Sequence, residues 1–370
     1  MTKINIFYGS DEAFSKIVPR PYKNLTLLAL EMDAENKRQE IVVRANNQQP
    51  EHVTKRKKRV ASLVAEANEY CGVQEHVINN FLRFLQNFSV QQLFLQNPPR
   101  KIVEQLIHFY GKEAMHVERE TYGEIDAQAL KRIDKEFDDK IVGQKAVKSE
   151  LLQALFPAIQ KKLNKPITIL FYGNSGVGKT ETANFLAEIL GGQLFRKQFS
   201  MFQNNEFATY LFGGKYNEKS FAQDLLARRS NVILLDEFDK ANPIFHSAFY
   251  QLFDEGIYED TNFHAEVYGS IIICTSNYKS QDEIKQNLGD PIFNRFDKVI
   301  KFSDLDPEAK KTIMQKEIVN YQEQFPEIQL DVNVRSKLLK SAQMLNNARQ
   351  IQHIVHDTFS YIGLKKLLEQ

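Results

Sequence analysis

The feature that most constrains the fold of this chain is the glycine-rich segment 173–180, which reads GNSGVGKT. An apolar run at 167–172 precedes it, and a helical pattern at 182–190 follows, with Gly191 and Gly192 as a stop. A strand, a glycine turn and a helix in this order let backbone N–H groups converge on an anion at the positive end of the helix. The segment therefore predicts a phosphate-binding loop within an α/β domain.

The residue types of this loop suit a nucleotide with its metal ion. Lys179 is placed to reach the outer phosphates, and the hydroxyl of Thr180 is a ligand for Mg²⁺. A plain strand-to-helix turn is the alternative, and the strand before and the helix after argue against it. The predicted nucleotide-binding residues of the loop are Asn174, Ser175, Gly176, Val177, Gly178, Lys179 and Thr180.

Composition excludes several other classes of protein. The 370 residues are 42% hydrophobic, which is enough for a real core, and 48 basic residues nearly cancel 47 acidic ones. The two cysteines, Cys71 and Cys274, have no metal-ligand or disulfide spacing. No apolar run approaches the roughly 20 residues that span a bilayer, and no secretory leader is visible. These observations predict a soluble, cytoplasmic protein without a membrane partner.

The pattern of apolar residues divides the chain into three parts. Residues 1–125 are expected to form a mixed, mainly helical domain, helical from about Val60 onward, with a core-forming aromatic stripe at 78–88. Within 126–303, apolar runs at 167–172, 232–235 and 271–274 alternate with helical stretches, as in a parallel sheet covered by helices. Residues 304–370 contain only helical patterns and predict a small helical domain. The fold class is α/β.

Two further strands end in residues that could perform chemistry. The run 232–235 is followed by Asp236 and Glu237, at the sheet edge where doubly wound folds bind ligands. We expect Asp236 to hold Mg²⁺ together with Thr180, and Glu237 to orient and deprotonate the attacking water. After the run 271–274 comes Asn277, whose amide could contact both the γ-phosphate and that water. This order of elements predicts hydrolysis as well as binding.

The series of motifs resembles the AAA+ ATPases, and within them the Clp family of protein unfoldases and disaggregases. The resemblance covers about two thirds of the chain and is carried by the loop and by four other segments, at 141–144, 228–243, 253–256 and 291–297. It implies a P-loop AAA+ module with a helical lid. It also implies ATP and Mg²⁺ as cofactors and an N-terminal region that selects a substrate or partner.

Individual roles follow from the same resemblance. Ile141, Val142 and Gly143 would pack on the adenine base. Arg295 resembles the arginine finger that reaches into the neighbouring subunit's site, which requires a homo-oligomeric, hexamer-like ring. Arg349, in the segment 347–351, resembles the second sensor, which touches the γ-phosphate of its own subunit.

The leading functional hypothesis is a ring ATPase that remodels or unfolds a protein or protein complex. The family's usual aromatic pore loop is not reproduced in this sequence: Tyr216 or Phe212 could grip a threaded substrate, and the segment 260–268 is either pore-facing or a simple hairpin. The alternative is a nucleotide-controlled regulatory switch or loader that does not thread. Nucleic acid remains a less favoured partner, through the basic run Lys55–Arg59. The tripeptide 362–364 lies in a helical pattern, so no peptidase partner is predicted.

Overall fold

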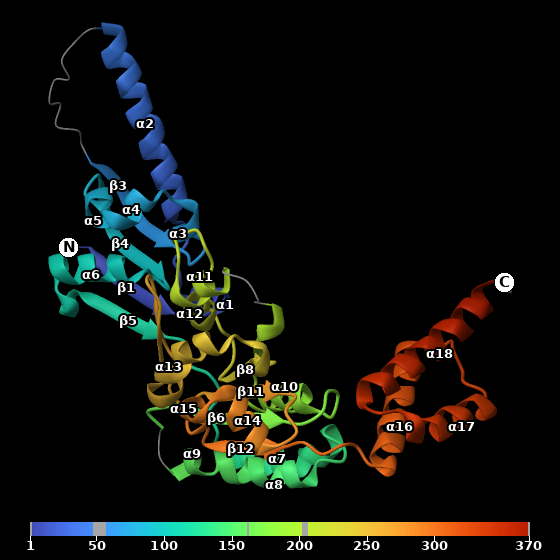
Figure 1. The fold of residues 1–370 in the computed structure, drawn as a ribbon. Coiled ribbons are helices and arrows are strands. Elements are labelled where there is room, and N and C mark those ends of the chain that lie inside the picture. Colours follow the sequence, from blue (N-terminus) through green and yellow to red (C-terminus); the bar gives the residue numbers. More distant parts are fainter. Residues whose placement is uncertain (1, 47–56, 161–162, 202–205, 369–370) are drawn as a thin grey trace. The chain divides into compact units, whose positions relative to one another are not determined.

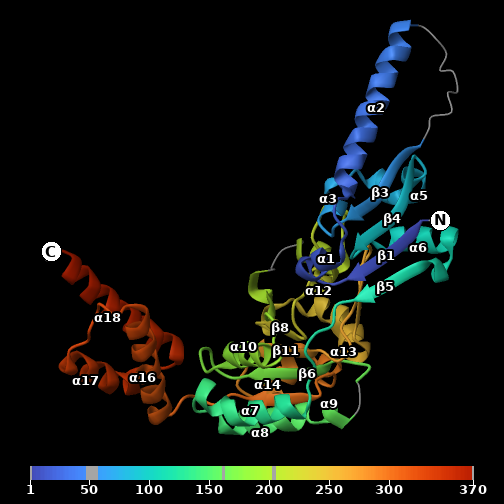
Figure 2. The same ribbon diagram turned by 180° about the vertical axis from the view of Figure 1, so that it is seen from behind.

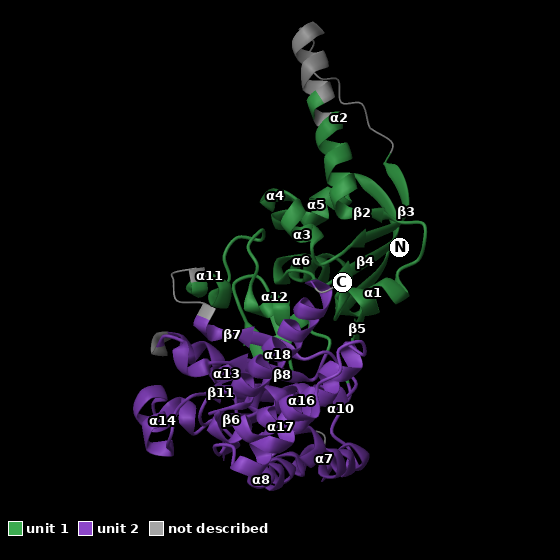
Figure 3. Cartoon of the chain, turned by 90° about the vertical axis from the view of Figure 1, so that its right-hand side faces the viewer, with its two compact units in different colours: residues 1–122, 204–229, 257–267 green, residues 123–203, 230–256, 268–370 purple. Residues whose placement is uncertain are grey.

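The computed structural model describes residues 2–46, 57–160, 163–201 and 206–368 (Figure 1). The chain divides into two compact units, shown in different colours in Figure 3. Unit 1 takes residues 1–122 together with 204–229 and 257–267, and unit 2 takes 123–203, 230–256 and 268–370. Two segments of the region expected to be the ATPase domain therefore cluster with the N-terminal residues.

Unit 1 is built on a five-stranded sheet in the order β2-β3-β4-β1-β5, in which every neighbouring pair is parallel. Apolar side chains such as Ile4, Leu63 and Leu93 are fully buried in its core. The strands are β1 (Lys3–Tyr8), β2 (Lys23–Asn24), β3 (Lys58–Ala65), β4 (Phe88–Gln96) and β5 (Met115–Arg119).

Helices connect and cover these strands, and α2 continues well past the end of the sheet (Figures 1 and 2). The N-terminal helices are α1 (Asp11–Ile17), α2 (Leu25–Asn46), α3 (Glu69–Gly72), α4 (Glu75–Asn79), α5 (Phe81–Leu85), α6 (Arg100–Tyr110) and the 3-10 turn η1 (Lys112–Ala114). The two later segments of unit 1 contribute α11 (Glu206–Phe212), α12 (Phe221–Leu226) and the antiparallel hairpin β9 (Ile257–Glu259) and β10 (His264–Glu266).

The mixed composition expected of the N-terminal region takes the form of this parallel sheet with its helices, and the aromatic stripe at 78–88 is core, as Phe81, Phe84 and Phe88 are buried. The expected helix from about Val60 is wrong, because Lys58–Ala65 forms strand β3. This strand lies between β2 and β4, and the run Leu63–Ala65 is fully buried. A strand buried on both faces has no alternation, so its apolar run is not distinguished from a helix by periodicity.

Unit 2 contains a second five-stranded parallel sheet, in the order β12-β6-β11-β8-β7. The three expected apolar runs form its central strands, and every residue of those strands is buried. The strands are β6 (Ile167–Tyr172), β7 (Phe195–Gln198), β8 (Val232–Asp236), β11 (Ile271–Ser276) and β12 (Lys298–Lys301).

Helices α7 and α8 lie side by side along this sheet and share one core with α10 (Figures 1 and 2). The helices of this part are α7 (Ala127–Lys140), α8 (Lys145–Leu155), α9 (Pro157–Gln160), α10 (Lys179–Ile189), α13 (Tyr250–Glu255), α14 (Gln281–Leu288) and α15 (Asp290–Phe293), with the 3-10 turns η2 (Phe199–Met201), η3 (Phe238–Lys240) and η4 (Pro243–Phe249). The parallel α/β architecture expected from the sequence is confirmed.

The C-terminal part of unit 2 is helical, as expected. Asp306 caps α16 by accepting from the N–H of Ala309, and Pro307 is the first helical residue. The part has a core of its own around Met314, Ile351 and Phe359. Its elements are α16 (Pro307–Gln324), α17 (Val332–Ser341), η5 (Ala342–Met344) and α18 (Ala348–Leu368). No helix of the described residues is both long enough and apolar enough to cross a bilayer.

Candidate nucleotide site

The glycine-rich loop leaves the buried strand β6 and turns directly into helix α10. At Gly173 a Cβ would stand 2.4 Å from the carbonyl oxygen of Phe302, so only glycine fits there. Gly178 precedes the first residue of α10 with φ of 108°, a conformation that L side chains avoid. The sequence pattern therefore folds into the expected cradle at a helix N-terminus.

Lys179 is folded back onto this loop. Its Nζ donates to the carbonyl oxygens of Gly173 and Asn174 at 2.6 and 2.8 Å, and to Oδ1 of Asn277 at 3.3 Å. Burial lowers the pKa of Lys179 to about 8, although the charges of Asp239, Asp236 and Glu237 act in the opposite direction. A buried ammonium whose hydrogen-bond acceptors among the described residues are neutral oxygens is poised to accept an anion such as a phosphate.

Asp236 ends strand β8 and is already bonded on both sides. Thr275 Oγ1 donates to its Oδ1 at 2.5 Å, while Arg196 donates to its Oδ2 through Nε at 3.0 Å and Nη2 at 2.5 Å. Arg196 lies on the neighbouring strand β7, opposite Leu234. The carboxylate is thus fixed at the sheet edge. A cation that binds it would compete with the guanidinium of Arg196 for Oδ2.

Glu237 follows with a left-handed backbone, φ 55° and ψ 43°, a conformation that is uncommon for residues other than glycine. Its N–H donates to Thr275 Oγ1 at 2.9 Å, and Gln198 Nε2 donates to its Oε2 at 3.0 Å. Hydrogen bonding from Ser200, and then from Gln198, lowers the pKa of Glu237. The group is therefore a carboxylate near neutral pH and can accept a proton or orient a water.

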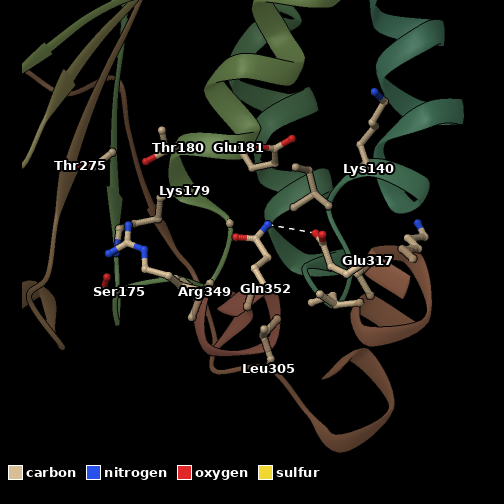
Figure 4. A pocket seen from close by; sticks show the side chains of 18 of the residues that line it. Lys140, Ser175, Lys179, Thr180, Glu181, Thr275, Leu305, Glu317, Arg349 and Gln352 are labelled. Carbon is tan, nitrogen blue, oxygen red and sulfur yellow. Dashed lines mark hydrogen bonds between the residues drawn. The ribbon is translucent and has the colours of Figure 1, made fainter. Parts of the chain in front are cut away.

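These residues surround one cavity of about 860 Å³, drawn in Figure 4. It brings together most of the residues expected from the sequence: Ile141, Val142, Ser175, Gly176, Val177, Gly178, Lys179, Thr180, Asp236, Glu237, Asn277 and Arg349. Strands β6, β8 and β11 thus deliver the loop, the two acids and Asn277 to a single place. These groups make part of the lining polar. Apolar surface in the lining comes from Ile141, Val142, Leu305 and Ile313.

Gly143, Asn174 and Arg295 do not line this cavity. Asn174 Nδ2 donates to Asp304 Oδ1 at 2.7 Å, so its side chain contacts Asp304 outside the cavity. A Cβ on Gly143 would stand 2.8 Å from Cβ of Ala309, which makes this glycine a close-approach position beside α16. Arg295 Nε pairs with Asp254 Oδ2 at 2.9 Å, and its guanidinium lies over the ring of Tyr250 at 4.0 Å.

The helical C-terminal part closes one side of the cavity. The N–H of Ala348, which begins α18, donates to the carbonyl oxygen of Gly176 at 3.0 Å. Arg349 and Gln352 follow on the same helix and line the cavity, and Gln352 donates to Glu317 Oε1 at 3.0 Å, the dashed line in Figure 4. The start of α18 is therefore attached to the phosphate-binding loop itself.

Among the cavity residues that the sequence did not predict, Arg196, Gln198 and Thr275 are the ones that contact the two acids. Strand β7 reads FRKQ, which has neither an apolar run nor an alternation that would mark it as a strand. Thr275 lies just before Asn277 in the sequence, but nothing there indicates its role. In the fold its hydroxyl donates to Asp236 and accepts from the N–H of Glu237.

The donor set fits a nucleotide-bound Mg²⁺ better than a resident metal. Among the described residues there is no group of three or more His, Cys, Asp or Glu side chains that could hold an ion. Mg²⁺ keeps several waters and binds through one or two protein oxygens plus phosphates. The hydroxyl of Thr180 and the carboxylate of Asp236 line the cavity and are oxygens of that kind.

Comparisons with known proteins agree with this geometry. Residues 164–329 match the AAA domain (Cdc48 subfamily). A ClpA homolog protein of Fuscovulum blasticum is 29% identical over 250 residues, which are 59% of this chain and 30% of that protein. The ATP-dependent Clp protease ATP-binding subunit ClpL of Staphylococcus aureus is 30% identical over 218 residues, 51% of this chain and 30% of that protein. The matched regions thus span about a third or less of these relatives.

A solved structure, the Hsp104–ADP complex of Saccharomyces cerevisiae, superposes with a TM-score of 0.53 at 19% identity. It covers 65% of this chain and 49% of that one, and at this identity it supports the fold alone. The loop, the paired acids after β8, Asn277 after β11 and the helical part beside the cavity occur in the expected order. Together with the matched AAA domain and the Clp relatives, this order of elements supports a Clp-type AAA+ ATPase.

Proposed function

We propose that this chain hydrolyses ATP and uses the energy to remodel a protein or protein complex within a ring of identical subunits. The observation that carries the proposal is the convergence of Lys179, Asp236, Glu237 and Asn277 on one cavity. A site that only bound nucleotide would need the loop and its lysine. The additional carboxylate, held ionised beside the first, is what hydrolysis requires.

The roles of the residues follow from their contacts. Lys179 would exchange its carbonyl partners for the β- and γ-phosphates, which would restore its full charge. Thr180 and Asp236 would hold Mg²⁺, which when bound neutralises charge on the phosphate oxygens. Glu237 would take the proton of the attacking water, and Asn277 would position that water. The apolar residues Ile141 and Val142 would pack on the base.

The proposed ring explains the position of Arg295. Its side chain is held on Asp254 and Tyr250 and does not line the cavity of its own chain. A guanidinium that completes a neighbour's site would stabilise the charge of the transition state there. Arg349, which does line the cavity of its own chain, would report the nucleotide state to helix α18.

A regulatory switch that does not thread polypeptide is the second candidate function. It is favoured by Tyr216, a residue expected to grip substrate, because Tyr216 packs against the N-terminal core. The nucleic-acid version has less support. Lys55 and Arg56 lie outside the described residues, and Lys58 is ion-paired with Glu31.

Replacing the expected catalytic acid tests the proposal. Glu237→Gln should retain nucleotide binding and lower ATP turnover at least about 100-fold, because general-base catalysis contributes that much or more. Turnover and fluorescent-nucleotide affinity are measured on the same preparation. Glu323→Gln, at an exposed position on α16, is the matched control and should turn over normally. A Glu237→Gln protein with near-normal turnover would contradict the assigned chemistry.

A further inference from the structure

Two segments of the ATPase region belong to the same compact unit as the N-terminal sheet (Figure 3). The first, residues 206–229, runs between strands β7 and β8, and the second, residues 257–267, runs between α13 and β11. We call them the docking segments. Along the chain they lie between β7, which carries Gln198, β8, which ends at Asp236, and β11, which Asn277 follows. A displacement of those strands would therefore act on the docking segments through the backbone.

Ion pairs and backbone bonds tie the second docking segment to the N-terminal residues. Arg119 Nη2 contacts Glu266 Oε1 at 3.0 Å, and Arg100 Nη1 contacts Glu259 Oε2 at 3.4 Å. The backbone N–H of Arg100 also donates to the carbonyl oxygen of Asn262 at 2.8 Å. The hairpin is thus held at both strands and at its tip.

The first docking segment makes contacts of a different kind. The ring of Tyr216 packs against the core of the N-terminal sheet, and its carbonyl oxygen accepts from Cys71 Sγ at 3.0 Å. The hydroxyl of Tyr122 donates to the carbonyl oxygen of Arg228 at 3.1 Å. Because an aromatic ring packed against a core loses those contacts when it moves away, Tyr216 stabilises the position of this segment against the N-terminal sheet.

Arg228 joins the two docking segments to each other and to the N-terminal residues. Its guanidinium donates to the carbonyl oxygens of Leu225 and Glu266 and lies over the ring of Tyr122 at 4.7 Å. The side chain is only 8% exposed, and burial lowers the pKa of Arg228. A charge withdrawn from water in this way is costly unless its partners stay in place, so the arrangement is specific.

The aromatic side chains of the docking segments differ in their exposure. Tyr216 is partly buried against the N-terminal core, and Phe263, in the loop of the hairpin, is 2% exposed. Phe212 is 46% exposed, but its carbonyl oxygen is bonded by the N–H and hydroxyl of Thr261. The segment 260–268 likewise contributes to a closed hairpin rather than an open loop.

The N-terminal partners all come from one edge of their sheet. Cys71 follows β3, Arg100 follows β4, and Arg119 and Tyr122 end and follow β5. The carboxyl ends of parallel strands form the edge where open α/β sheets bind their ligands. The docking segments therefore occupy the position in which such a sheet usually holds a ligand.

We propose that residues 206–229 and 257–267 hold the N-terminal domain as the element on which ATP turnover acts, instead of gripping a threaded polypeptide. The inference rests on the proposed ATPase function and specifies its output. Changes at the γ-phosphate move the strands on either side of each docking segment, and the docked N-terminal domain moves with them. The N-terminal domain would then both select the protein partner and transmit to it the movement that remodels it.

Cys71 provides a native reporter of this docking. Its thiol is half-buried against Tyr216 and burial raises its pKa, whereas Cys274 is fully buried. Without nucleotide, Tyr216→Ala should speed the labelling of Cys71 by a maleimide at least about tenfold, because it removes the packed ring that keeps local opening rare. Tyr216→Phe and the matched control Phe212→Ala should label at the wild-type rate. Cys71→Ser should remove the signal.

The nucleotide dependence of the same signal tests the coupling. In the Glu237→Gln protein, saturating ATP and Mg²⁺ should change the labelling rate of Cys71 by at least about threefold relative to ADP, because docking follows the nucleotide state. An unchanged rate in Tyr216→Ala would overturn the docking. Equal rates in ATP and ADP, in a protein shown to bind both, would overturn the coupling and leave the ATPase proposal standing. Failure to bind ATP would instead refute the ATPase proposal, while the nucleotide-free comparison still decides the docking.

Discussion

At the level of single residues, some side chains of the site could be predicted from the sequence, and others are recognised only in the folded structure. Lys179, Thr180, Asp236 and Glu237 were predictable because each stands at a fixed offset from an apolar run or a glycine turn. Arg196 and Gln198 were not, since a four-residue polar strand has no sequence signature and its register against β8 is a tertiary property. Arg196 and Gln198, which the sequence did not predict, donate hydrogen bonds to Asp236 and Glu237, which it did.

Arg196 should compete with Mg²⁺ for Asp236. Arg196→Gln removes a guanidinium bonded to that carboxylate, and we expect the half-saturating Mg²⁺ concentration for ATP turnover to fall about threefold to tenfold, as for a partly exposed charge-assisted pair. The measurement is turnover against free Mg²⁺ at saturating ATP. Lys197→Gln is the matched control, with the same charge change on the same strand. Equal Mg²⁺ requirements in the two variants would refute the competition.

At the level of elements, the apolar runs at 167–172, 232–235 and 271–274 were read correctly because fully buried parallel strands are nearly continuous in hydrophobicity. The prediction is wrong at β3, because the second half of this strand is a continuous buried run that periodicity does not distinguish from a helix. The grouping of α11, α12 and the β9–β10 hairpin with the N-terminal sheet had no sequence signal. It depends on contacts such as that of Arg228 with Tyr122, more than 100 residues apart.

The hairpin should be sensitive to pH through His264. Its two ring nitrogens contact Glu259 and Glu266 at 2.5 and 3.3 Å, and hydrogen bonding to Glu266, then to Glu259, raises the pKa of His264. Because the folded pKa exceeds the unfolded one, the stabilisation is complete below the unfolded value of about 6.5 and is lost as pH rises through the folded value. The hairpin should therefore open more readily in alkaline solution.

Hydrogen exchange of the peptide 257–267, corrected for intrinsic rates, measures this effect. Protection should be lower at about pH 9 than at about pH 6 in the native protein, and His264→Gln should make protection independent of pH in this range. Equal protection of the native hairpin at both pH values would show that the imidazolium contributes nothing to its closure.

For the whole molecule, the proposed ring can be tested by mixing inactive variants. Glu237→Gln lacks the base and Arg295→Ala lacks the guanidinium offered to a neighbour. If Arg295 acts between subunits, random equal mixing gives about a quarter of the sites an intact acid from one chain and an intact arginine from the next. Turnover should recover to about that fraction once subunits have exchanged. No recovery in verified mixed assemblies would exclude action between subunits.

The sequence predicts much more of the structure of unit 2 than of unit 1. Unit 2 follows from ordered motifs, each local in sequence, so its α/β class and most of its site were predictable. Unit 1 has no such motif, and its sheet joins strands separated by long helical connections whose pairing is set by tertiary packing. Its recruitment of residues 206–229 and 257–267 is a property of the assembled fold and of no single stretch.

The discontinuous composition of unit 1 has a practical consequence for anyone who would dissect this protein. Cutting the chain after Tyr122 would not release an autonomous enzyme, because the ring of Tyr216 would lose its cover and the buried guanidinium of Arg228 would lose its aromatic neighbour. Grafting a foreign N-terminal half onto the nucleotide-binding half would fail for the same reason. A working chimaera would have to import three separate stretches of sequence at once.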